Sequence, residues 1–233
     1  MMVMPSNHSS ALIHYLAGRY PNRIGWLIGP TGLAKTKLRD WMPFACDNDA
    51  FSAWANEKEW DYLTWINMLK KITSLRQSPR WVLVPDVVAE REKTILAWEK
   101  YAPEASTFGF PLAFAVQDGM TPKDVPKKAD VVFVGGTTDW KWDNLRLWTD
   151  NFIRVHVGRV NSLSKLRLCE RLDVESVDGT GWFRDGNGGQ SEKELRHWFE
   201  NEIDPQMEMN LRTARDAHGT GDGNVNDESS DCN

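Results

Sequence analysis

The chain has 233 residues, of which 41% are hydrophobic and 26% are charged. This length suits one domain with a substantial core and excludes two domains of ordinary size. The formal net charge is −5, but residues 215–233 hold five acidic residues and one arginine. The preceding part of the chain is therefore close to neutral, so a nucleic-acid interface has to be a local basic patch.

The three cysteines, Cys46, Cys169 and Cys232, are scattered and form no C-x-x-C pair. This spacing argues against a disulfide framework and against a structural zinc site, and it predicts a reducing, cytoplasmic setting. The first residues lack a basic flank followed by a sustained apolar stretch, and no apolar run reaches the roughly 18 residues of a membrane span. We therefore expect neither export nor membrane insertion.

Short apolar segments with many β-branched residues recur along the chain. They are IGWLIG from residue 24, FACDND from 44, WVLVPD from 81, LAFAVQD from 112, VVFVGG from 131, IRVHVGR from 153 and VESVDG from 174. Such nearly continuous apolar segments are typical of strands that are buried on both faces. The sequence thus predicts seven strands, or eight if one strand is irregular.

Amphipathic helical patterns lie between these segments. One example places Tyr62, Trp65, Ile66, Leu69 and Ile72 on a single helical face. Strands that alternate with helices indicate an α/β fold with a parallel sheet. Residues 1–213 are predicted to form one domain, and residues 214–233, rich in Gly, Asp, Asn and Ser, a disordered acidic and polar tail.

Nearly every predicted strand ends in a polar residue or in glycines. Asp47, Asp86, Gln117 and Asp178 are examples, as is the pair Gly135–Gly136. A closed barrel gathers all carboxyl ends of its strands in one mouth, whereas an open doubly wound sheet spreads them along an edge. We expect the first arrangement, a compact TIM-like (β/α) barrel.

Several carboxylates at one mouth would suit glycosyl transfer or hydrolysis. In such reactions one carboxylate attacks an oxocarbenium-like carbon and another moves protons. Aspartate and glycine also end strands simply because they suit turns. The ordered set of strand ends, rather than any single position, favours the chemical interpretation.

The blocks CDNDAF, VPDVV, FAVQDG, VFVGGT, HVGR and SVDG, in this order, resemble those of the tRNA-guanine transglycosylase superfamily. The likeness spans residues 24 to 184 and is greater to the phage branch, the DpdA-type DNA-guanine transglycosylases. The resemblance implies a (β/α) barrel enzyme that exchanges a guanine base for a 7-deazaguanine through a covalent intermediate.

The resemblance also assigns roles to the acidic residues. Asp178 stands at the position of the nucleophile, which would attack C1′ of the nucleoside. Asp47 stands at the proton-transfer position, but Asp49 replaces a glycine of the family, so either carboxylate could move the proton. Asp86 matches the carboxylate that holds the outgoing and the incoming base.

Further base-binding positions follow from the same blocks. They are Gln117, Gly135 and Gly136 for the base oxygen, Phe51 and Val157 for the two ring faces, and His156 as an additional candidate. An ionised carboxylate can accept N1–H and the exocyclic amine of guanine, while an amide N–H or a glycine backbone N–H can donate to O6.

The implied partners are guanine-containing DNA and a free 7-deazaguanine base, with no cofactor and no metal. The tRNA enzymes have a cysteine-rich zinc motif after the nucleophile, and its absence here favours DNA. Candidate phosphate contacts are Arg159, Lys141, Arg184 and Lys35. Trp140, Trp142, Trp182 and Phe183 are candidates for stacking on bases.

A different function is suggested by IGPTGLAKTK, residues 28–37. This stretch resembles a phosphate-binding loop, in which backbone amides cradle a nucleotide. Ala34, however, stands where the second glycine is required for close backbone approach. A P-loop-like ATPase therefore remains an alternative, as does a tRNA-acting or non-catalytic member of the barrel family.

Overall fold

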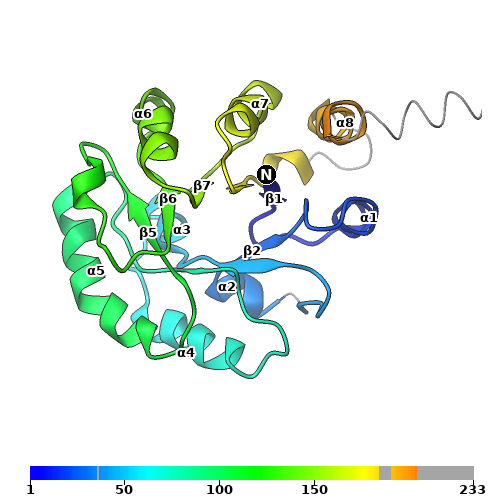
Figure 1. Ribbon diagram of the computed structural model, residues 1–233. Coiled ribbons are helices and arrows are strands. Elements are labelled where there is room, and N and C mark those ends of the chain that lie inside the picture. The colour runs from blue at the N-terminus through cyan, green and yellow to red at the C-terminus, as the bar shows by residue number, and fades with distance from the viewer. Residues whose placement is uncertain (36, 184–189, 204–233) are drawn as a thin grey trace, which may run out of the picture. The chain divides into compact units, whose positions relative to one another are not determined.

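The computed structural model describes residues 1–35, 37–183 and 190–203. Within Met1–Glu192, the first of two compact units, eight parallel strands form one sheet in the order β1-β8-β7-β6-β5-β4-β3-β2 (Figure 1). The strands are β1 (Met2–Met4), β2 (Trp26–Ile28), β3 (Phe44–Cys46), β4 (Val82–Leu83), β5 (Leu112–Val116), β6 (Val131–Val134), β7 (Val155–Val157) and β8 (Ser176–Asp178).

The two ends of this sheet meet, so the sheet closes into a barrel. Val3 N donates to Arg23 O at 2.8 Å and Gly25 N donates to Val3 O at 3.1 Å. Two isolated parallel bridges, between Val3 and Ile24 and between Ser6 and Leu27, connect the same segments. The expected TIM-like (β/α) barrel is confirmed.

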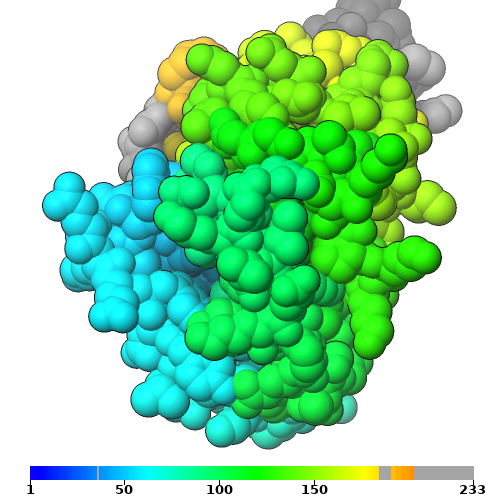
Figure 2. Space-filling view, turned by 90° about the vertical axis from the view of Figure 1, so that its left-hand side faces the viewer, coloured from blue at the N-terminus to red at the C-terminus, as the bar shows by residue number. Residues whose placement is uncertain are grey.

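Helices follow most strands and surround the barrel (Figure 1). They are α1 (Ala11–Arg19), α2 (Pro30–Leu33), α3 (Ala50–Ala55), α4 (Tyr62–Ile72), α5 (Arg91–Ser106), α6 (Thr138–Asn151) and α7 (Leu163–Arg171), with 3₁₀ turns Pro122–Asp124 and Gly181–Phe183. Figure 2 views the side on which α4 and α5 lie, where consecutive segments coloured cyan to green form the surface. The predicted amphipathic pattern is α4, whose apolar face is buried.

The second unit begins at Lys193. Its described residues complete α8 (Gln190–His197) and a short π-helix, Trp198–Ile203. The predicted boundary at residue 213 and the predicted tail, 214–233, lie outside the described residues. No helix in the described part of the chain has both the length and the apolar character needed to cross a membrane.

The barrel interior is filled by alternate residues of the strands, because side chains i and i+2 point to the same face. The apolar part of this core consists of Met2, Met4, Leu27, Ala45, Trp81, Leu83, Ala113, Ala115 and Val131, with Phe133 packed against it. The cluster combines three alanines, Ala45, Ala113 and Ala115, with the large rings of Trp81 and Phe133. On β7 and β8 the interior positions are instead polar, namely His156, Ser176 and Asp178.

Each of the seven predicted apolar segments contains a strand. The additional strand that completes the barrel is β1, which was not among the predicted segments. The segment IGWLIG forms β2 rather than the first strand. The first strand is β1 near the N-terminus, which pairs with β8 through Met2–Ser176, Val3–Val177 and Met4–Asp178. Its length equals that of β2, β3, β7 and β8, but its segment consists mainly of methionine and does not have the composition typical of a strand.

Because β1 joins β2 to β8, we expect its inward side chain Met4 to matter for stability. Met4 is completely buried, and Met4→Ala is expected to lower the free energy of unfolding by about 2–5 kcal/mol. Leu63→Ala on α4 is the control, since Leu63 is 65% exposed. Urea denaturation measures both changes, and equal small effects would contradict the closing role of β1.

Candidate active site

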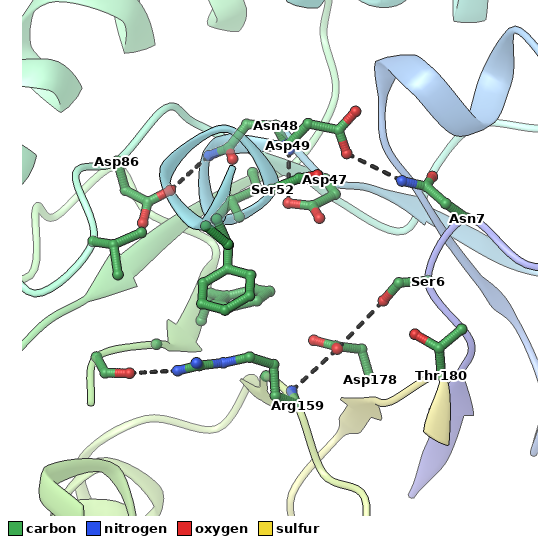
Figure 3. A pocket seen from close by; sticks show the side chains of 18 of the residues that line it. Ser6, Asn7, Asp47, Asn48, Asp49, Ser52, Asp86, Arg159, Asp178 and Thr180 are labelled. Atoms are coloured by element: carbon green, nitrogen blue, oxygen red, sulfur yellow. Dashed lines mark hydrogen bonds between the residues drawn. The ribbon is translucent and has the colours of Figure 1, made fainter. Parts of the chain in front are cut away.

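A cavity of about 710 Å³ opens at the carboxyl ends of the strands (Figure 3). Its walls come from segments after β1, β3, β4, β5, β6, β7 and β8, so the barrel gathers the polar strand ends as predicted. The lining includes Ser6, Asn7, Asp47, Asn48, Asp49, Phe51, Asp86, Gln117, Gly135, Gly136, Gly158, Arg159, Asp178 and Thr180. Four of these residues are aspartates.

Asp178 ends β8 and is held by three hydrogen-bond donors. Its Oδ1 accepts from Ser6 Oγ at 3.3 Å and from the Arg159 backbone N–H at 3.1 Å. Its Oδ2 lies 3.2 Å from His156 Nε2. Asp178 is only 6% exposed, so these contacts fix the direction in which its carboxylate faces the cavity.

His156 lies inside the barrel beneath this carboxylate and does not line the cavity. Its Nδ1 is 2.8 Å from Ser176 Oγ, and its ring packs 4.7 Å from Phe133 and 4.8 Å from Trp81, centroid to centroid. If Ser176 Oγ–H donates to Nδ1, Nε2 carries the hydrogen that points at Asp178. His156, predicted as a base-binding candidate, thus contacts Asp178 instead.

Asp47 lies on the wall opposite Asp178, and both carboxyl groups point into the cavity (Figure 3). Its Oδ1 accepts from the Asn48 backbone N–H at 2.7 Å. Burial, together with the negative charges of Asp49, Asp178 and Asp86, raises the pKa of Asp47 to about 8. At pH 7 Asp47 is therefore mainly protonated and can donate a proton.

Both carboxyl oxygens of Asp49 accept hydrogen bonds from neighbouring groups. Its Oδ2 accepts from the Thr31 N–H at 2.9 Å and from Thr31 Oγ1 at 2.7 Å, and its Oδ1 accepts from Asn7 Nδ2 at 3.1 Å. Its φ of 59° explains why a glycine suits this position, since aspartate is one of the few other residues that tolerate this conformation. Of the two candidates for proton transfer, the geometry favours Asp47.

Asp86 forms a connected polar cluster with Asn48 and Gln117. Asn48 Nδ2 donates to Asp86 Oδ1 at 2.8 Å, and Gln117 Nε2 donates to Asp86 Oδ2 at 2.7 Å. Burial raises the pKa of Asp86 to about 6, against the opposing effect of these two donors. Above that pH Asp86 is mainly ionised and remains able to accept further N–H groups.

The expected backbone donors of the glycine pair are not available to a base. Gly135 N donates to Val116 O at 3.1 Å, and Gly136 N donates to Gln117 Oε1 at 3.0 Å. The pair provides space instead: Gly136 has a φ of +69°, and a Cβ there would lie 2.6 Å from the Trp140 ring. The geometry therefore does not favour a role for these amides in reading the base oxygen.

Phe51 and Arg159 form one wall of the cavity. The Arg159 guanidinium lies 4.4 Å from the centroid of the Phe51 ring, and its Nη2 donates to Gly136 O at 2.5 Å. Phe51 is 39% exposed, and the centroid of its ring lies 5.6 Å from the centroid of the Trp54 ring. Val157, predicted as the second stacking residue, is fully buried in β7 and does not line the cavity.

The other predicted phosphate contacts are not gathered at the cavity. Lys141 is only 1% exposed and donates to Gly158 O, so its ammonium is not available to a phosphate in solvent. Lys35 is exposed and lies outside the cavity lining. Arg184 is outside the described residues. Of the stacking candidates, Trp182 and Phe183 are buried in the fold, so their rings are not exposed for stacking on bases.

The stretch that resembles a phosphate-binding loop has a different structure. Gly29 N donates to Asn7 Oδ1 at 2.7 Å and Thr31 N donates to the Asp49 carboxylate. Amides that would cradle a phosphate are thus already bonded, one of them to an anion. Residue 36 is outside the described residues.

Three functional candidates were not identified from the sequence: Ser6, Asn7 and Asn48. Ser6 and Asn7 follow β1, which carries no strand signal. Asn48 lies between Asp47 and Asp49 in the sequence. The concentration of polar residues in that segment was the one sequence feature that could have identified it. Its side chain also accepts from Ala50 N at 2.8 Å, which ties the cluster to the start of α3.

No protein-family profile and no curated protein sequence matches the chain. Among the described residues, no group of three or more His, Cys, Asp or Glu side chains has the arrangement of a metal site. The chemistry of the cavity therefore has to be inferred from its own side chains.

The raised pKa of Asp47 predicts a pH-dependent effect on stability. Near pH 4 the Asp47 carboxyl is protonated in the folded chain and roughly half protonated in the unfolded chain. As the pH rises to about 8, folding requires a proton that the unfolded chain has released, so stability falls. We expect Asp47→Asn to raise the melting temperature by at least about 2 °C at pH 8 and to have little effect near pH 4.

Calorimetry at both pH values measures this difference. Asp143→Asn on the exposed face of α6 controls for the loss of one negative charge. A stabilisation by Asp47→Asn that is the same at pH 4 and pH 8 would show that Asp47 titrates as an ordinary carboxyl.

Proposed function

We propose that the protein is a DNA-guanine transglycosylase, which exchanges guanine in DNA for a 7-deazaguanine base. The observation that carries this proposal is the pairing of two unlike carboxyl groups across one cavity. Asp178 is anchored by three donors, whereas Asp47 has a pKa of about 8. Environments that separate the protonation states of two carboxyl groups are typical of sites that combine a nucleophile with a proton donor.

In the proposed reaction, an Asp178 carboxylate oxygen attacks C1′ of the target nucleoside. The C1′–N9 bond breaks, its electron pair leaves with guanine, and Asp47 supplies a proton to the departing base. The incoming base then gives a proton to Asp47 and attacks C1′ with its nitrogen, which releases the Asp178 carboxylate. The covalent intermediate keeps the nucleic-acid backbone intact during the exchange.

Asp86 and Gln117 support recognition of a guanine-like ring. The Asp86 carboxylate retains lone pairs for N1–H and the exocyclic amine. Gln117 Nε2 has a second N–H in addition to the one that it donates to Asp86, and this hydrogen suits O6. Adenine offers the opposite donor pattern at these edges, so the cluster would discriminate against it.

Phe51, which lines the cavity, and the exposed Trp54 beside it support a nucleic-acid substrate, since exposed aromatic rings can stack on bases. The choice of DNA rests on the resemblance of the sequence blocks. A tRNA substrate is therefore included in the test.

The decisive experiment incubates the protein with guanine-containing DNA and a 7-deazaguanine base, denatures the mixture and analyses it by gel and mass spectrometry. We expect a covalent protein–DNA adduct that is absent in Asp178→Asn and retained in Asp143→Asn. Single-stranded DNA, double-stranded DNA and tRNA are compared. Reaction with tRNA alone would overturn the DNA substrate, and the absence of both adduct and exchange with all three would overturn the enzymatic proposal.

The two titrating carboxyl groups predict a bell-shaped pH profile. Base exchange requires ionised Asp86 and protonated Asp47, so kcat/KM should rise through a pH of about 6 and fall through about 8. Initial rates of base incorporation between pH 5 and pH 9 measure the profile. Asp47→Asn should lower kcat about 10²–10⁴-fold and make the alkaline limb shallower. A profile that is flat across this range would contradict the assignment.

Asp86→Asn is expected to weaken use of the guanine substrate, because one ionised acceptor of two N–H groups is replaced by a neutral amide. Loss of a hydrogen bond to a charged group corresponds to a decrease in kcat/KM of about 10- to 200-fold. Competition between guanine- and adenine-type bases checks the cause. Unchanged base preference in Asp86→Asn would show that Asp86 does not read the ring.

A further inference from the structure

Lys141 on α6 is an unusually buried charged residue. Its side chain is 1% exposed, and among the described residues it makes no ion pair with a carboxylate. Burying an ammonium group is costly unless its hydrogen bonds are satisfied. Its Nζ donates to the backbone carbonyl of Gly158 at 2.5 Å and lies 5.0 Å from the centroid of the Trp142 ring.

The carbonyl that Lys141 contacts belongs to a particular peptide group. The same peptide group, between Gly158 and Arg159, carries the N–H that donates to Asp178 Oδ1 at 3.1 Å. One planar unit therefore accepts from a cation at its oxygen and donates to a carboxylate at its nitrogen. Hydrogen bonds in such a chain polarise one another and strengthen together.

The backbone at this point is held in a special conformation. Arg159 has a φ of +58°, which is uncommon for a residue other than glycine, aspartate or asparagine. Its guanidinium is fixed on Gly136 O and over Phe51, while Gly158 N donates to Val134 O at 3.2 Å. These contacts hold the peptide group in an orientation that lets it join Lys141 to Asp178.

We propose that Lys141 is a positioning residue for Asp178 and acts through the Gly158–Arg159 peptide group, which it polarises so that the Arg159 N–H holds the carboxylate in its direction toward the cavity. This inference rests on the proposed function only for its expected effect on the rate of adduct formation. The electrostatic connection itself is a property of the folded chain.

The charge of Lys141 is retained under ordinary conditions. Burial and the nearby Arg159 cation lower the pKa of Lys141 to about 8, while Asp178 opposes this change. Lys165 on α7 also lowers it, and the Cys169 thiol faces the same group. At pH 7 the amine is therefore mainly protonated.

The first test is spectroscopic and needs no enzymatic activity. Lys141→Met removes the charge and keeps an apolar side chain of similar length. We expect the Arg159 amide proton resonance to move upfield in this variant, and also in Asp178→Asn. Lys165→Met is the matched control, because Lys165 lies 4.5 Å from the same Trp142 ring but the structure shows no contact with the peptide. An unchanged Arg159 amide resonance in Lys141→Met would overturn the proposal.

A second measurement leaves Lys141 in place, so it remains informative even if Lys141→Met does not fold. Coupling between two charged sites is reciprocal. The titration of the Lys141 amine, followed by NMR at its Cε, should move to lower pH in Asp178→Asn and not in Asp143→Asn. Equal titration in the two variants would show that Lys141 and Asp178 are not connected.

The kinetic test separates positioning from substrate binding. In Lys141→Met we expect the rate of adduct formation to fall about tenfold, equivalent to about 1.4 kcal/mol, with KM changed by less than about threefold. A rise in KM alone, or unchanged kinetics, would overturn the positioning role. If the spectroscopic result is obtained while the wild-type chain forms no adduct, the connection stands and the proposed function fails.

Discussion

The structure of the cavity depends on how the Asp178 carboxylate is held at the rim of a largely apolar barrel. Its three donors come from two distant parts of the chain: Ser6 follows β1, whereas His156 and the Arg159 amide belong to β7 and the segment after it. A charged group at the edge of a packed core is stable only with such partners. Barrel closure is therefore required for the site, because the pairing of β1 with β8 brings Ser6 to Asp178.

A second constraint is the concentration of negative charge in one cavity. Four aspartates line it, and the cation that also lines it, Arg159, is directed at Gly136 O and at the Phe51 ring. Like charges in a partly desolvated space cannot all ionise, so the carboxyl group with the weakest compensation retains its proton. Asp47 accepts one backbone hydrogen bond, whereas Asp49 and Asp178 each have three donors or close polar partners. Asp47 is therefore the carboxyl group that retains its proton.

The sequence predicted the barrel and most of its polar mouth because both follow from local patterns. Buried parallel strands are continuous apolar segments, and their ends are marked by Asp47, Asp86, Gln117 and Asp178. Contacts between distant segments carry no such signal, so the three residues of β1 and the role of Ser6 were missed. The alternation within β7 explains a further error: His156 faces the barrel interior, so its neighbour Val157 has to face outward and cannot reach the cavity.

The Arg159 segment joins the two halves of the cavity. Its backbone N–H is bonded to Asp178, and its side chain covers one face of Phe51, the ring expected to stack on a base. A base that enters the cavity therefore has to pack on the free face of Phe51 or displace the guanidinium. In the second case, the Arg159 side chain would lose its hydrogen bond to Gly136 O, one of the contacts that hold the segment whose N–H donates to Asp178. Occupancy of the base site and the direction of the carboxylate would then be coupled through this single residue.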